Sequence, residues 1–170
     1  MVNHYKQWDI KKNIEPGTPS SKSVFKVIEK FSNSGIKCVI NIDPILPLIT
    51  DSKKDLSNIL NTANDIGIDY ISGAILRIRY DIWEGIKYLL QILNMNNFTK
   101  EYEKIFNFKD PLESKKNLIA EKGYTESIMQ YLRYEVKKRK MKFGFPLLHN
   151  KKLYPTKSKK DMVTLLDFIN

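Results

Sequence analysis

Polar and charged residues stand at the ends of the two apolar runs that predict strands in the first half of the chain. Asn41 and Asp43 end the first run, and Arg77 and Arg79 end the second. In parallel α/β folds the carboxyl ends of the strands share one edge of the sheet, where active-site groups collect. Carboxylate and guanidinium groups bind polar or anionic ligands there through charge-assisted hydrogen bonds. The pattern predicts a ligand-binding edge if the strands are parallel.

A second polar group, Glu15, Thr18 and Ser20, stands where a helix is predicted to begin. Thr18 is suited to cap that helix, and Pro19 to its first position, because proline lacks the N–H that would be unpaired there. Free N–H groups at a helix entry also bind carboxylate or phosphate. Capping alone is the structural alternative for Thr18 and Ser20.

Structural roles are equally open at the strand ends. Asp43 is placed to order the loop before Pro44. Arg77 is placed to pair with Asp69 or Asp81. The sequence alone leaves both roles, ligand binding and structural pairing, open for these side chains.

The excess positive charge of the chain lies in one segment. The 170 residues carry a formal net charge of +10, and residues 133–160 hold eleven Lys and Arg against Glu135 alone. Such a cluster is the electrostatic signature of contact with a phosphate backbone, and a solvated lysine-rich surface is the alternative. The predicted nucleic-acid-binding residues are Arg133, Lys137, Lys138, Arg139, Lys140 and Lys142.

Several kinds of site and location are excluded by composition. One cysteine, Cys38, cannot build a disulfide framework and fits a reducing cytosol. His4 and His149 are far apart and lack carboxylates at metal-binding spacing, so no metal site is predicted. An apolar signal core and a run approaching the roughly 20 apolar residues of a membrane span are both absent, which predicts a cytoplasmic protein without membrane contact.

Helices and strands are predicted to alternate through the first part of the chain. An amphipathic helix stopped by Gly35 precedes a strand over residues 36–42 and a loop held by two prolines. A helix capped by Asp51 then leads to a strand over 68–78, in which Gly73 allows close backbone approach. A helix over 82–93, capped by Asp81, is the third predicted to cover one side of these strands.

The second part of the chain is predicted to be mainly helical. Short helices are expected over 101–108 and 161–169 and a long helix over 125–140, with a short strand over 142–145. At 42% hydrophobic residues the chain can bury one ordinary core. It is too short for a complete eight-stranded barrel, which needs about 250 residues.

A series of short motifs resembles one known family. The motifs are Glu-Pro-Gly-Thr-Pro-Ser at 15–20, Ser-Gly-Ile at 34–36, Asp-Pro-Ile-Leu-Pro at 43–47, Thr-Asp at 50–51 and Leu-Arg-Ile-Arg at 76–79. In this order they resemble the second half of radical SAM proteins of the DNA repair photolyase type, relatives of spore photoproduct lyase. The similarity extends over residues 8–145 and is strongest before Leu90.

The resemblance implies a fold and a set of binding residues. The fold is α/β, with the C-terminal part of a radical SAM (partial TIM-type) parallel βα barrel over 1–93 and a mainly helical C-terminal extension over 94–170. In that family the later strand ends and the helix entry bind S-adenosylmethionine and position the substrate. The implied cofactor-binding residues are Glu15, Thr18, Ser20, Asp43, Arg77 and Arg79.

The family also needs a 4Fe-4S cluster, which the thiolates of a CxxxCxxC motif hold. This chain has Cys38 alone, inside a predicted strand. The resemblance therefore implies the C-terminal half of a radical SAM, lyase-like enzyme, incomplete by itself. A separate N-terminal half that carries CxxxCxxC is the implied partner, and the substrate stays unassigned.

Two other interpretations stay open. A non-catalytic half-barrel module that binds nucleic acid through segment 133–160 predicts binding that weakens steeply with salt. A non-functional fragment predicts instability, because a chain that starts at Met1 leaves the edge of the first strand without a neighbour, and unpaired edges associate with other chains.

Overall fold

The computed structural model describes residues 14–108 and 118–146. The helices in these ranges are α2 (Ser21–Asn33), α3 (Lys53–Asp65), α4 (Trp83–Ile92), α5 (Phe98–Ile105) and α6 (Lys122–Lys138), with a short 3₁₀ turn at Tyr80–Ile82. The strands are β1 (Val39–Ile45), β2 (Tyr70–Ile75), β3 (Arg77–Ile78), β4 (Leu118–Ile119) and β5 (Lys142–Phe143).

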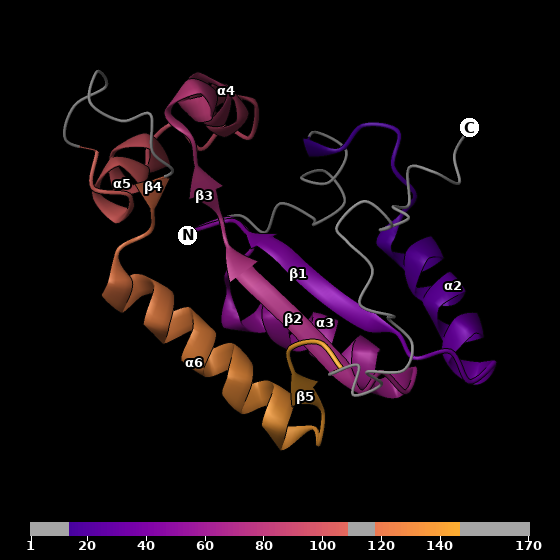
Figure 1. Cartoon of the computed structure of the whole chain (residues 1–170). Coiled ribbons are helices and arrows are strands. Elements are labelled where there is room, and N and C mark those ends of the chain that lie inside the picture. The colour runs from indigo at the N-terminus through magenta and orange to yellow at the C-terminus, as the bar shows by residue number, and fades with distance from the viewer. Residues whose placement is uncertain (1–13, 109–117, 147–170) are drawn as a thin grey trace, which may run out of the picture.

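A parallel sheet in the order β1-β2-β5 forms the centre of the protein (Figure 1). The spatial order of these three strands is also their order along the chain. In the sequence α3 connects β1 to β2, and α6 directly precedes β5. Parallel pairing of β1 and β2 agrees with the predicted alternation of helix and strand. The described strands form an open sheet and not a closed barrel, so the barrel stays a proposal.

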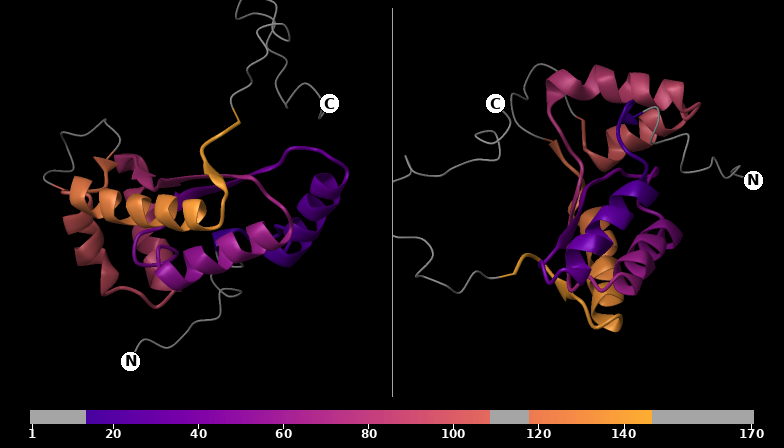
Figure 2. Two further views of the ribbon diagram at one scale, coloured as in Figure 1. Left: turned by 90° about the horizontal axis from the view of Figure 1, so that it is seen from below. Right: turned by 90° about the vertical axis from the view of Figure 1, so that its right-hand side faces the viewer.

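Helices α3 and α6 lie side by side on one face of this sheet (Figure 2). The hydroxyls of Ser57 on α3 and Tyr131 on α6 are hydrogen bonded at 2.9 Å. On β2, Gly73 faces α6 so closely that an added Cβ would lie 3.1 Å from both Leu132 Cδ2 and the carbonyl oxygen of Ile42. The predicted close approach at Gly73 is therefore confirmed, and the packing of α6 is its cause.

One predicted helix lies elsewhere. The sequence predicted three helices on one side of the first two strands, whereas α4 packs with α5 beyond the carboxyl end of β2 (Figure 1). Trp83 of α4 lies against Tyr102 of α5, with ring centres 6.5 Å apart, and against Phe108 at 4.4 Å. These aromatic side chains give α4 its own packing partner, and α6 takes the predicted place on the sheet.

The predicted second strand is two strands. Residues 68–78 divide into β2 and β3 because β1 ends at Ile45 and the chain beyond Leu76 has no parallel neighbour in the described ranges. β3 instead pairs antiparallel with β4. The Leu76 N–H still bonds the Ile45 carbonyl at 3.0 Å, which marks the last contact with β1.

The first strand begins three residues later than predicted. α2 ends with Gly35 in the left-handed region at φ 78°, as expected, but the Ile36 N–H then bonds the Phe31 carbonyl at 3.0 Å. This bond belongs to the helix terminus. Ile36 is therefore held by α2, and pairing with β2 starts at Val39.

All three predicted helix caps are wrong by one or more residues. Ser20, and not Thr18, caps α2 by accepting from the Ser23 N–H at 3.1 Å. The helix therefore starts at Ser21, and Pro19, predicted at its first position, lies before the cap. Ser52, and not Asp51, caps α3, because the Ser52 hydroxyl accepts from the Asp55 N–H and donates to the Asp55 carboxylate.

The third cap differs because of an ion pair. α4 follows the 3₁₀ turn and starts after Ile82 without a side-chain cap. Asp81, predicted as that cap, instead pairs with Arg79.

α6 and β5 belong to the predicted C-terminal extension, yet they complete the sheet that the predicted barrel region begins. The described parts of 1–93 and 94–170 share one hydrophobic core. The predicted helix over 161–169 and the histidines at 4 and 149 lie outside the described residues. None of the helices described between residues 14 and 146 has the length and apolar character needed to cross a bilayer.

Candidate functional site

The two faces of the sheet differ in character. Ile71 and Ile75 point with Gly73 toward α3 and α6 and are buried. Side chains alternate along a strand, so Ser72 lies on the other face, beside its register partner Asn41. The face away from the helices therefore carries polar side chains.

The helix-entry residues predicted to bind a cofactor make local contacts. The Ser20 hydroxyl serves as the N-cap of α2 and is hydrogen bonded to that of Ser23 at 2.8 Å. The Thr18 hydroxyl donates to the Glu15 carbonyl at 2.9 Å. The structural alternative is thus observed for Ser20, and Thr18 orders the turn before the helix.

The strand-end residues divide into paired and unpaired groups. Arg79 forms a two-pronged ion pair with Asp81, and this hydrogen bonding raises the pKa of Arg79 and lowers the pKa of Asp81. Arg77, predicted to pair with Asp69 or Asp81, forms no ion pair with a described carboxylate, because Arg79 occupies Asp81. Asp43 is exposed at the end of β1.

No described contact joins the residues at the start of α2 to the residues at the strand ends. Hydrogen bonds and ion pairs between Glu15, Thr18 or Ser20 and the strand-end residues Asp43, Arg77 and Arg79 are absent from the described part of the chain. A group of three or more His, Cys, Asp and Glu that could hold a metal ion is likewise absent there. The six residues remain candidates only.

A tyrosine and carboxylate cluster lies on the loop after β1. The Tyr124 hydroxyl donates to the Asp51 carboxylate, and the Tyr102 hydroxyl donates to the Pro47 carbonyl at 2.7 Å. Burial raises the pKa of both hydroxyls, and the nearby Asp51 charge raises it further. The cluster fixes this loop against α5 and α6. Sequence reasoning missed it, since Asp51 and Tyr124 are 73 residues apart.

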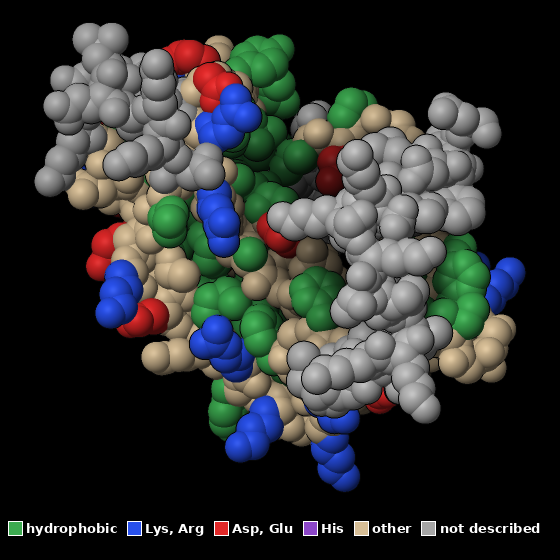
Figure 3. Space-filling view, in the orientation of Figure 1, with side chains coloured by type: hydrophobic (Ala, Val, Ile, Leu, Met, Phe, Trp, Pro, Cys, Tyr) green, Lys and Arg blue, Asp and Glu red, His purple; other side chains and the backbone are tan. Residues whose placement is uncertain are grey.

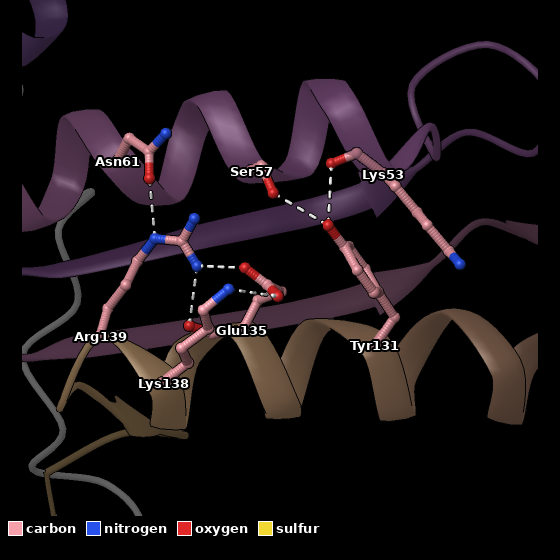
Figure 4. A network of polar contacts seen from close by, with 7 residues as sticks. All are labelled: Lys53, Ser57, Asn61, Tyr131, Glu135, Lys138 and Arg139. Atoms are coloured by element: carbon pink, nitrogen blue, oxygen red, sulfur yellow. Dashed lines mark hydrogen bonds and ion pairs between the residues drawn. The ribbon is translucent and has the colours of Figure 1, made fainter.

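Two of the six predicted nucleic-acid-binding residues have structural partners (Figure 4). Arg139 is largely buried and donates to the Asn61 side chain at 2.9 Å and to the Glu135 carboxylate at 2.5 Å. Lys138 approaches the same carboxylate at 3.8 Å. The hydrogen bond from Arg139 holds the pKa of Glu135 below its usual value, despite the burial of this carboxyl group. Arg139 thus stabilises the contact between α3 and α6.

The other four predicted residues form an exposed group that we call the basic patch: Arg133, Lys137, Lys140 and Lys142. Arg133 and Lys137 are one turn apart on α6, Lys140 follows the end of the helix, and Lys142 opens β5. None of the four forms an ion pair with a described carboxylate.

Aromatic rings support two cations of the basic patch. The guanidinium carbon of Arg133 lies 5.3 Å from the ring centre of Phe143, and Lys142 Nζ lies 5.4 Å from that of Tyr70. These are cation–π distances, which restrict where the charges can move. Figure 3 shows Lys and Arg side chains spread over the face that carries β5 and α6, with apolar side chains between them. Sequence reasoning missed Tyr70 and Phe143. The pairing of β2 with β5 brings Tyr70 beside Lys142, and the packing of β5 against α6 brings Phe143 beside Arg133.

Comparison with known proteins gives one distant relative. The chain is 35% identical over 80 residues to the uncharacterized protein ORF301 of Acidianus two-tailed virus, a match that includes 45% of this chain and 27% of that protein. The matched part is thus little more than a quarter of the viral protein. No family model matches the chain, and no solved structure matches it significantly.

Proposed function

We propose that this chain is a nucleic-acid-binding α/β module that contacts the phosphate backbone through the basic patch. The observation that carries the proposal is the set of four exposed cations without a described carboxylate partner, two of them held over aromatic rings. Lys and Arg that release counterions from phosphates supply most of the sequence-independent affinity for nucleic acid. Contacts to phosphate position a protein without reading bases, so binding is expected on many sequences.

Paired and unpaired cations are expected to behave differently. The charges of Lys138 and Arg139 already interact with the buried Glu135. Arg133, Lys137, Lys140 and Lys142 have only water and, for two of them, a ring as partners among the described groups. These four therefore gain most from a phosphate partner.

The test is a salt titration of binding to a DNA duplex of mixed sequence, followed by fluorescence anisotropy. For a protein that contacts about four phosphates, the logarithm of the binding constant should fall against the logarithm of the salt concentration with a slope of about −3.6. Each substitution Arg133→Gln, Lys137→Gln, Lys140→Gln and Lys142→Gln should reduce that slope by about 1.

The matched controls remove exposed lysines elsewhere, by Lys54→Gln on α3 and Lys100→Gln on α5. They should leave the slope unchanged. Binding that does not depend on salt would overturn the proposal. An equal reduction of the slope in the control variants and the patch variants would also overturn it, because it would indicate only an effect of net charge.

A second candidate function rests on the strand order. We propose as this alternative that the chain forms part of a radical SAM barrel resembling the DNA repair photolyase group. Neighbouring parallel strands with α3 and α6 on the same face are found in β/α barrels, in which the inner face and the strand ends carry the site. Asp43, exposed near the end of β1, and Arg77, exposed at the start of β3, would then be its binding residues for S-adenosylmethionine.

The residues present do not fit an iron–sulfur cluster. Cys38 is the single cysteine of the chain, and its thiol donates to the Ile36 carbonyl at 3.5 Å. Three thiolates would have to come from another chain. The test is co-expression with neighbouring genes that encode CxxxCxxC, with co-purification as the readout. If no product of such a gene co-purifies, the enzyme proposal fails and the nucleic-acid proposal is unaffected.

A further inference from the structure

β2 and β5 share one face that none of the described helices covers. α3 and α6 lie on the opposite face, and α4 and α5 pack beyond the carboxyl end of β2 (Figures 1 and 2). Tyr70 and Ser72 lie on the uncovered face, because they alternate along β2 with the buried Ile71. Lys142 is the register partner of Tyr70 and lies on the same face. A half-exposed ring, a hydroxyl and a cation therefore share this surface.

The ring of Tyr70 and the ammonium group of Lys142 can both take part in binding a nucleotide. Lys142 Nζ lies 5.4 Å from the centre of the ring, and its side chain is exposed. Lysine carries its charge on a flexible four-carbon stem, so Lys142 can leave the ring for a phosphate. The ring then accepts the flat face of a base, since aromatic side chains stack on any base. One nucleotide thus supplies a partner for each group.

Polar side chains lie next along the same face. Ser72 is about 6.6 Å from Tyr70 along β2, at 3.3 Å per residue. Asn41 of β1 is the register partner of Ser72. Neither side chain is hydrogen bonded to another described residue. Hydroxyl and amide groups both donate and accept, and the edges of unpaired bases offer partners of both kinds.

The charge beside this face favours a polyanion. Arg133 and Lys137 of α6 and Lys140 after the helix end lie next to Lys142 in the basic patch. Asp69, exposed before Tyr70, is one carboxylate against these four cations. A strand with one base on Tyr70 therefore brings its neighbouring phosphates to the basic patch.

We propose that the face of β2 and β5 binds nucleic acid as a single strand, with one base stacked on Tyr70 and the phosphates on the basic patch. This inference rests on the proposed function and narrows its ligand to strands with unpaired bases. In a duplex the bases are paired and stacked on one another, so Tyr70 cannot reach the flat face of a base. A duplex contacts the basic patch alone, whereas a single strand contacts the patch and the ring.

Substitution of Tyr70 tests the stacking contact in the full chain. Fluorescence anisotropy gives the dissociation constants for a DNA strand of about 12 nucleotides and for the duplex of the same sequence. Tyr70→Leu should raise the constant for the strand about tenfold. The constant for the duplex should rise by at most about threefold, because only the support of Lys142 is lost. Tyr70→Phe keeps the ring and should bind the strand as the wild type does.

The matched control is Tyr88→Leu, which removes a ring that is 64% exposed on α4. Both dissociation constants should stay unchanged in this variant. Circular dichroism verifies that each variant is folded. If Tyr70→Leu weakened strand and duplex equally, or neither, the stacking site would be overturned and the proposed phosphate contact would stand.

Salt dependence separates the ring from the charges. A single strand that contacts about four phosphates should give a slope of about −2.8. Stacking releases no counterions, so Tyr70→Leu should lower the affinity for the strand without changing this slope. Lys142→Gln should make the slope shallower by about 0.7. Binding of strand and duplex that does not respond to salt would overturn the proposed function itself.

Photochemical cross-linking tests the contact in the unmodified protein. A DNA strand that contains 5-iodouracil is irradiated in complex with the full chain, and mass spectrometry locates the linked residue. The cross-link should lie at Tyr70, because a stacked base is in contact with the ring. Cross-links that form only at other aromatic residues would overturn the inference even if the strand binds tightly.

Discussion

Glu135 shows how a single residue decides the role of its neighbours on α6. Its carboxylate is buried, accepts a hydrogen bond from Arg139 and forms an ion pair with Lys138. Arg139 in turn bonds the Asn61 side chain of α3 (Figure 4). A charge inside this contact is stable only while its partners remain.

Glu135→Gln should therefore destabilise the fold by about 1–3 kcal/mol near neutral pH. The pKa of Glu135 is lower in the folded than in the unfolded chain, so its stabilisation is present above the unfolded pKa and is lost as the pH falls through the folded pKa. The difference between wild type and variant should shrink below about pH 4. Urea unfolding of both proteins at several pH values measures this difference in the free energy of unfolding.

The control for this variant is Glu126→Gln, which removes an exposed carboxylate 3.8 Å from Lys122 on the same helix. Exposed pairs of this kind contribute at most about 1 kcal/mol. A loss for Glu135→Gln that stays constant from neutral to acidic pH would contradict the role given to its charge.

Residue types alone predicted six equivalent cations between 133 and 142, and the structure separates them. Arg139 differs from Arg133 because Asn61, 78 residues earlier in the chain, lies beside it. Periodicity along α6 cannot show this partner. The same limit applies to Asp51, whose sequence position suggested a helix cap and whose observed contact is Tyr124.

Helices were predicted correctly where the sequence carries a clear helical pattern. The helices predicted before Gly35, after Asp51 and over 125–140 exist as α2, α3 and α6, and Gly35 is left-handed after α2 as expected. Predicted boundaries shifted where a neighbouring residue offered a better cap, as Ser52 did beside Asp51. The position of α4 depended on aromatic contacts with α5, which no periodicity within α4 encodes.

A pair of glycine substitutions tests the packing of these elements. Gly73→Ala should destabilise the fold by roughly 1–3 kcal/mol, because the new methyl group meets backbone and Leu132 at 3.1 Å. Gly85→Ala on α4 has open space around the added atom and should stabilise by about 0.5–1 kcal/mol through helix propensity. Chemical denaturation of both variants gives the comparison. A neutral Gly73→Ala would show that α6 lies farther from β2 than described.

The charge of the whole molecule is uneven, and its consequence extends beyond binding. The net charge of +10 arises from segment 133–160, of which the basic patch is a described part. Like charges that lie close together repel and lower the stability of the folded state. Salt screens this repulsion, with a Debye length of about 10 Å at 0.1 M.

The melting temperature should therefore rise by about 2–5 °C as monovalent salt is increased through this range. The double variant Lys137→Gln with Lys140→Gln should show a smaller rise, because part of the repulsion is already gone. Differential scanning fluorimetry measures both proteins. A melting temperature that falls with salt would mean that attractive ion pairs outweigh the repulsion.

At the scale of the fold, the sequence indicated parallel α/β structure correctly, because helix and strand patterns alternate without long gaps. It did not predict that β5 would join the sheet beside β2. The two residues of β5 carry little signal, and their pairing depends on the length and direction of α6. Membership of a barrel family remains a proposal, because the described strands form an open sheet.

Because β5 is the last described strand in the sequence, the sheet cannot be completed until most of the chain has been synthesised. β2 ends at Ile75 and its partner β5 begins at Lys142, so residues 76–141 must be made before the third strand exists. Until α6 has emerged, the surface of β2 at Ile71 and Gly73 has no cover from that helix. Contacts so distant in sequence form slowly, and apolar surface exposed meanwhile is prone to aggregation. The nascent chain therefore passes through an interval in which the unit of β1, α3 and β2 exposes apolar side chains such as Ile71.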